Sequence, residues 1–157
     1  MVGFRSRLEV GTGSEYRFKE LLERTGWAVY SIGSQHFDFS ESVRKIIENN
    51  TVKFIRHLPD FLIVCGADAK LVEVKGTTPN YYDGENFSIE DDSLETLRKI
   101  ASLGIKVIVV FENRPNEFYW GFVDEIKETP IHYQFLSSYG SRTPASLIKK
   151  KSLIKWE

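Results

Sequence analysis

Uninterrupted apolar runs along this 157-residue chain predict buried β-strands. Residues 61–65 and 105–111 are rich in isoleucine and valine, as expected for strands that are covered on both faces. Shorter segments at 27–32 and 119–123 predict two further strands, the second of them as a hairpin partner of 105–111. Residues 70–75 predict another strand. The sequence therefore favours a central β-sheet.

Helical spacing of apolar residues predicts three helices, at residues 12–24, 40–49 and 88–103. Gly26 and Gly104 mark the ends of the first and third helices, because glycine tolerates the left-handed conformation that commonly ends a helix. The third helix separates two predicted strands, which predicts a right-handed crossover between parallel strands. Residues 76–87 are predicted to be a turn-rich loop, and the pattern weakens after Pro130.

Composition is ordinary for one globular domain that spans residues 1–157, with 41% hydrophobic and 27% charged residues. The single cysteine, Cys65, excludes an intrachain disulfide, fits a reducing compartment, and is interpreted as a small buried apolar residue. The chain has no secretory signal pattern and no apolar run of about 18 residues, so we expect a cytoplasmic protein without a membrane partner. The net charge of −1 means that binding to nucleic acid would depend on local basic patches.

Two carboxylates and one lysine, Asp60, Glu73 and Lys75, lie in a segment at 58–75 that is otherwise typical of a buried hairpin. If Gly66 and Ala67 form a two-residue turn, Cys65 lies opposite Asp68, and Asp60 lies opposite Glu73. Directly opposed residues share a sheet face, and Lys75 lies on that face because side chains alternate with period two. Burying three charges costs several kcal/mol unless they serve one another or a metal.

Each of these residues also has a simpler interpretation. Asp60 could be a turn residue at the start of a strand, and Glu73 with Lys75 could be a plain ion pair. The two carboxylates together favour chemistry, because such close acids repel each other unless one takes up a proton or a cation binds.

Pro59-Asp60, followed by Glu73-Val74-Lys75, resembles the motif of the PD-(D/E)xK nuclease superfamily. Residues 13–22 and 26–30 look like the first helix and first strand of archaeal Holliday-junction resolvases. The resemblance implies a restriction-endonuclease-like α/β fold, in which a central mixed β-sheet is flanked by helices with an α-β-β-β-α-β core. Residues 33–57 would be an inserted helical segment and 144–157 a basic C-terminal extension.

The resemblance also implies a Mg²⁺ site, in which Mn²⁺ should substitute. Asp60 and Glu73 would hold the metal, and the Val74 carbonyl and Glu15 on the first helix would join them. Lys75 would orient the attacking water or stabilise charge on the phosphate. Glu15 could instead be the third helical residue of a capping box that begins at Thr12.

The expected partner is DNA, duplex or branched, and the expected activity is metal-dependent endonuclease cleavage. A resolvase cuts two strands symmetrically, so a homodimer is expected. The alternative is a non-catalytic nucleic-acid-binding or assembly domain that keeps the fold. Candidate DNA contacts are the basic residues of the insert, a threonine after the catalytic strand and the C-terminal lysines: Arg44, Lys45, Lys53, Arg56, Thr77, Lys149, Lys150 and Lys151. Charged runs of this kind can also be solvated surface.

Overall fold

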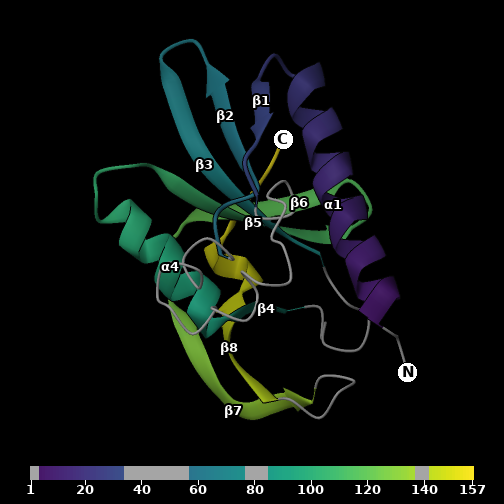
Figure 1. The fold of residues 1–157 in the computed structure, drawn as a ribbon, viewed down its shortest axis with the longest axis vertical. Helices are drawn as coiled ribbons and strands as arrows, with labels where there is room; N and C mark the ends of the chain where they lie inside the picture. Colours follow the sequence, from purple (N-terminus) through teal and green to yellow (C-terminus); the bar gives the residue numbers. More distant parts are fainter. Residues whose placement is uncertain (1–3, 34–56, 77–84, 137–141) are drawn as a thin grey trace, which may run out of the picture.

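The computed structural model describes residues 4–33, 57–76, 85–136 and 142–157. Its larger sheet has six strands in the order β1-β2-β3-β5-β6-β9 (Figure 1). The bounds of these strands are Ala28–Ser31 for β1, Phe61–Cys65 for β2, Asp68–Lys75 for β3, Val107–Arg114 for β5, Glu117–Phe122 for β6 and Ile154–Lys155 for β9. The sheet is mixed, because β3 and β5 are parallel and the other neighbouring pairs are antiparallel.

The hairpin of β2 and β3 has the predicted register. Gly66 has φ of +59°, which suits the first position of a two-residue turn that requires positive φ. Cys65 pairs with Asp68, and Ile63 pairs with Lys70. Continuing this register by one pair beyond Phe61 places Asp60 opposite Glu73, as predicted.

Two helices cover opposite faces of the larger sheet (Figure 1). Helix α1, Phe4–Arg24, packs Phe18 and Leu22 against one face. Helix α4, Asp91–Ala101, packs Leu94, Leu97 and Ile100 against the other. Because α4 connects β3 to the parallel strand β5, the predicted crossover between parallel strands is confirmed.

Helix α1 begins eight residues earlier than the sequence pattern predicted, at Phe4 instead of Thr12. Gly11 and Gly13 made residues 4–11 look non-helical in the sequence, because glycine is unfavourable in the interior of a helix. Thr12 is therefore a helix-interior residue, and the capping-box interpretation of Glu15 is wrong.

A second sheet, with strand order β4-β8-β7, was not predicted. Its strands are Asn86–Glu90, Arg142–Lys149 and Glu128–Leu136. Residues 86–90 were divided between a loop and a helix, although Phe87 and Ile89 alternate with polar residues as in a strand with one buried face. Pro130 obscured β7, but β7 is an edge strand, where proline is tolerated.

The C-terminal residues belong to these sheets. After β8, a short 3-10 helix, η2, spans Lys150–Ser152, and β9 then pairs with β6. Trp156 packs edge-on against Phe18 of α1, with ring centroids 5.1 Å apart, and against Trp120 at 5.8 Å. The segment 144–157 is thus part of the core structure as well as a basic surface.

The interpretation of Cys65 as buried is wrong, because Cys65 is exposed at the turn end of β2. The helix predicted at 40–49 and most of the predicted insert lie outside the described residues. Among the residues that are described, no helix is long and apolar enough to cross a membrane.

Candidate active site

Asp60 lies directly before β2, and hydrogen bonds to both its backbone carbonyl and its side chain hold it in place. Its carbonyl accepts hydrogen bonds from the backbone N–H groups of Ile32 and Gly33, at 2.9 and 3.2 Å. Its Oδ2 accepts a hydrogen bond of 2.7 Å from the backbone N–H of Val74 on β3. The residue is only 7% exposed. Asp60 is therefore a buried acid fixed against β3.

Glu73 and Lys75 lie two residues apart on β3 and form an ion pair, with Lys75 Nζ 2.5 Å from Glu73 Oε1. Glu73 is also 7% exposed. Both residues alternate with Val72 and Val74, which pack on the α1 face of the sheet, so Glu73 and Lys75 belong to the α4 face. The simpler interpretation of Glu73 and Lys75 was a plain ion pair. The two residues do form an ion pair, and a second buried acid, Asp60, lies beside it.

Glu15 lies on α1 between the fully buried Ser14 and the half-buried Arg17. It is itself half-buried. Burial raises the pKa of Glu15 above its ordinary value of 4.5, and the negative charge of Glu73 raises it further, while Lys75 opposes both. Glu15 is thus close enough to sense both residues of the strand motif.

The same electrostatics act more strongly on Asp60. Burial, followed by the charges of Glu73 and Glu15, raises the pKa of Asp60 to about 9, although the Val74 N–H and Lys75 favour the ionised form. Burial alone would lower the pKa of Lys75, but the charge and hydrogen bond of Glu73 and the charge of Asp60 outweigh it, and the pKa lies above 10.5. The four predicted catalytic residues therefore form one electrostatically coupled group.

The acids of this group are of the ligand type that a hard divalent cation takes. The group has three acids and only one lysine. Burial and the two neighbouring acids raise the pKa of Asp60, and a bound cation would lower that pKa by favouring the ionised carboxylate. Within the described part of the chain, no group of three or more His, Cys, Asp or Glu side chains is placed to hold a metal ion. Mg²⁺ does not require such a group, because it is commonly held by one or two carboxylates, water and substrate phosphate. The Val74 carbonyl and Glu15 remain predicted ligands.

A buried network that the sequence analysis missed anchors the turn of α1 that carries Glu15. Glu112 near the end of β5 is 4% exposed. Its carboxylate accepts a hydrogen bond of 2.5 Å from Ser14 Oγ and two from the Arg17 guanidinium, at 2.6 and 2.7 Å. The backbone N–H of Asn116 donates a further bond of 3.0 Å. The network therefore fixes α1 to the sheet on both sides of Glu15.

The pKa of Glu112 is shifted in the opposite direction to that of Asp60. Burial would raise the pKa of Glu112, but the hydrogen bonds from Arg17, Ser14 and Asn116 outweigh it and hold the pKa below 4.5. One signal was available in the sequence, since Glu112 is an acid directly after the most apolar strand. Its side-chain partners Ser14 and Arg17 lie more than 90 positions away, and no local pattern indicates them.

The predicted DNA contacts divide into two groups. Lys149, Lys150 and Lys151 lie at the end of β8 and in η2 and line an open pocket of about 460 Å³. The other five, Arg44, Lys45, Lys53, Arg56 and Thr77, lie outside the described residues.

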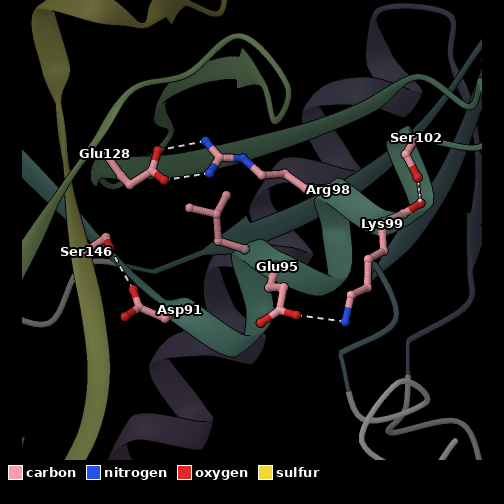
Figure 2. A pocket seen from close by; sticks show the side chains of 8 residues that line it. Asp91, Glu95, Arg98, Lys99, Ser102, Glu128 and Ser146 are labelled. Atoms are coloured by element: carbon pink, nitrogen blue, oxygen red, sulfur yellow. Dashed lines mark hydrogen bonds and ion pairs between the residues drawn. The ribbon is translucent and has the colours of Figure 1, made fainter. Parts of the chain in front are cut away.

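A second open pocket, of about 530 Å³, lies beside α4, and several of its lining side chains bind one another. Figure 2 shows Arg98 and Glu128 extended toward each other, and their two hydrogen bonds are 2.6 and 2.7 Å long. Arg98 also donates to the carbonyls of Val123 and Ile126, both at 2.9 Å. The Ser146 hydroxyl donates to Asp91 at 2.6 Å. These contacts join α4 to the second sheet, and we assign this pocket a structural role.

Comparison with known proteins supports the fold. The sequence matches no protein-family model and no curated protein. Among solved structures, the chain is similar to that of Hjc, a Holliday junction resolvase from the archaeal hyperthermophile Archaeoglobus fulgidus, with a TM-score of 0.52 and 15% sequence identity. The similarity covers 86% of each chain. The expected restriction-endonuclease-like fold, with a mixed sheet and flanking helices, is confirmed.

Proposed function

We propose that this chain is a metal-dependent endonuclease that hydrolyses phosphodiester bonds in DNA. The observation that supports the proposal is that two acids, Asp60 and Glu73, are each only 7% exposed, directly next to the register pair of Phe61 and Val72, and that Lys75 binds Glu73. A purely structural hairpin has no need of two buried, mutually repelling carboxylates. The similarity in fold to a resolvase agrees with a nuclease.

In this proposal Asp60 and Glu73 would hold Mg²⁺, and the Val74 carbonyl and Glu15 would complete the protein's contribution. Mn²⁺ substitutes for Mg²⁺. The bound ion would supply polarisation of the scissile phosphate and a lowered pKa for a water molecule. The hydrogen bond from the Val74 N–H orients Asp60 toward β3, which fixes the distance between the two acids before any ligand arrives.

Lys75 has two roles in the proposed mechanism. Without substrate it neutralises Glu73, which reduces the repulsion between the two acids. With a cation on the carboxylates, Glu73 no longer needs that charge. The Lys75 ammonium, a compact donor, then orients the attacking water or stabilises the negative charge that develops on the phosphate.

We further propose a preference for branched DNA, because the fold is similar to that of a protein described as a Holliday junction resolvase. Symmetric cleavage of a four-way junction requires two active sites, so the acting species would be a homodimer. Light scattering of the protein alone and with a junction tests this part independently of cleavage.

The test is a cleavage panel of a four-way junction, a flap, a linear duplex and a single strand, each with Mg²⁺, Mn²⁺ or EDTA. Asp60→Asn is the inactive variant. Asp68→Asn is its matched control, since Asp68 is an acid of the same hairpin that pairs with Lys70 and Lys106 at the far end. We expect metal-dependent cleavage by the wild type and by Asp68→Asn only. Binding without cleavage of any substrate would favour the alternative, a non-catalytic nucleic-acid-binding domain.

A further inference from the structure

A basic pocket lies at the junction of the second sheet and η2. Its lining side chains are those of Glu85, Asn86, Lys149, Lys150 and Lys151, and its volume is about 460 Å³. Three lysines and one glutamate give the lining a net charge of +2. Ammonium and amide groups donate hydrogen bonds, which suits the oxygens of a phosphate.

The backbone around these lysines is well fixed. Lys149 pairs with Asn86 between β8 and β4, and the Lys150 N–H donates a hydrogen bond of 2.8 Å to the Glu85 carbonyl. The turn is closed by the Ser152 hydroxyl, which donates to the Lys149 carbonyl at 2.7 Å. The pocket is therefore built from regular structure that holds its position on the sheet.

The position of the pocket relative to the candidate active site follows from strand register. Lys75 on β3 pairs with Phe111 on β5, and Phe111 pairs with Tyr119 on β6. Residues paired in this way share a sheet face. Lys150 Nζ lies 5.7 Å from the Tyr119 ring centroid.

Aromatic packing places the second sheet over that same face. Phe87, next to Asn86 on β4, stacks on Phe111 with ring centroids 4.8 Å apart and an interplanar angle of 11°. It also lies 6.0 Å from the Tyr119 ring. Lys150, which lies over the Tyr119 ring, and the Glu73–Lys75 pair are therefore on one face of the larger sheet. Asn86 and Lys149 alternate with the buried pair of β4 and β8, so they line the pocket from the other side of the second sheet. In Figure 1 the yellow helical turn of η2, which follows β8, lies just below β5 in this view.

The separation can be worked from the sheet geometry. Lys75 and Tyr119 are two strands apart, and neighbouring strands lie about 4.8 Å apart, which gives a separation of about 10 Å at the backbone. Phosphates of one DNA strand advance about 3.4 Å along the helix axis per nucleotide. A phosphate held by the Lys150 ammonium beside Tyr119 would therefore lie about three nucleotides from the phosphate that is cut.

We propose that Lys149, Lys150 and Lys151 form a subsite for one backbone phosphate of the DNA that is cleaved at Asp60 and Glu73. The proposal rests on the proposed nuclease function and adds the position of a second contact. The subsite sets the register of the strand in the active site without reading its sequence, because phosphate contacts position DNA and base contacts specify it.

The test compares two triple variants of equal charge. The pocket variant is K149Q/K150Q/K151Q. The control is R24Q/K99Q/K106Q, whose exposed basic residues lie at the end of α1, in α4 and directly before β5. Circular dichroism and thermal unfolding first establish that both variants fold. Fluorescence anisotropy then measures binding of a four-way junction and a duplex, without divalent metal, over a range of salt concentrations.

One phosphate contact changes the slope of log affinity against log salt by about 0.9. We expect the pocket variant to lose about one unit of slope on both DNA forms, and the control variant to keep the wild-type slope. The contact is then located with substrates in which single phosphates within three nucleotides of the cut are replaced by neutral methylphosphonates. Wild type should lose affinity at one position beyond the scissile phosphate, and the pocket variant should lose none at that position.

The outcomes separate the two proposals. If wild type cuts DNA but the pocket variant keeps the wild-type salt slope and methylphosphonate profile, the lysines are solvated surface, and the subsite is refuted while the nuclease stands. Equal losses of slope in both variants would also refute the subsite, because the effect would then be one of overall charge. If wild type neither binds nor cuts any DNA form, both proposals are refuted.

Discussion

Asparagine in place of Asp60 should stabilise the metal-free protein at neutral pH. Burial and the charges of Glu73 and Glu15 raise the pKa of Asp60 to about 9, from an ordinary value of 3.8. At pH 7 the folded protein therefore keeps a proton that the unfolded chain has released. The Val74 N–H that donates to Asp60 can donate equally to an asparagine oxygen.

The magnitude follows from proton linkage. When only the folded state holds the proton, the free energy of unfolding falls by about 1.4 kcal/mol for each pH unit above the unfolded pKa. The interval from 3.8 to pH 7 gives a loss on the order of 4 kcal/mol, and the loss grows until about pH 9. The Asp60→Asn variant avoids this loss because its amide ionises in neither state. The advantage of Asp60→Asn should vanish below about pH 4, where aspartate is protonated in both states.

The assay is urea unfolding in EDTA, followed by tryptophan fluorescence, at intervals from pH 5 to pH 9. Asp68→Asn is the control, because the pKa of Asp68 is shifted in the opposite direction: the hydrogen bond from Lys70 lowers it. Replacing the Asp68 carboxylate should therefore give no stabilisation. Mn²⁺ at 100 times its dissociation constant should recover about 2.7 kcal/mol for the wild type and little for Asp60→Asn. If Asp60→Asn is less stable than wild type at pH 7, or the difference does not change with pH, Asp60 is ionised in the fold and the reasoning fails.

Three further predictions concern single contacts. Lys75→Met should lower the rate of DNA cleavage by at least 100-fold and leave the affinity in fluorescence anisotropy nearly unchanged, because the charge acts on the transition state; equal losses in rate and affinity would instead make Lys75 a binding residue. Glu112→Gln should lower the free energy of unfolding by about 3–5 kcal/mol at pH 7. The pKa of Glu112 is lowered in the fold, so this difference should be complete above about pH 5 and shrink as the pH falls below 4.5, and a constant difference would contradict it. Arg98→Met should lower the free energy of unfolding by about 1–3 kcal/mol by leaving Glu128 unpaired. The double variant with Glu128→Met should lose less than the sum of the two single losses, and strict additivity in thermal unfolding would show that the pair is uncoupled.

The hairpin was predictable because its register depends on local chemistry. Gly66 permits the positive φ of a two-residue turn, and once that turn is fixed, side-chain alternation places Glu73 and Lys75 on one face. The parallel pairing of β3 with β5 was predictable for a similar reason, since a helix separates the two strands in sequence.

The second sheet was not predictable from local patterns. The pairing of β4 with β8 joins residues such as Phe87 and Ile148, which are about 60 positions apart, and the alternation in β4 covers only five residues. Such a short alternating segment also fits the first turn of a helix, which explains the misplaced start of α4. The Glu112 network depends on contacts at still longer range, and its residues carry no periodic signal.

The exposed position of Cys65 has a practical consequence. It is the only cysteine of the chain, and it lies at the turn end of β2, five residues from Asp60 at the other end. At 3.3–3.4 Å per residue, the two positions are about 17 Å apart along the strand. A maleimide dye would therefore attach at a single known point, outside the proposed catalytic group. Resonance energy transfer from that dye to acceptors on each arm of a DNA junction could then measure how the nucleic acid is oriented on the native sequence, without any engineered substitution.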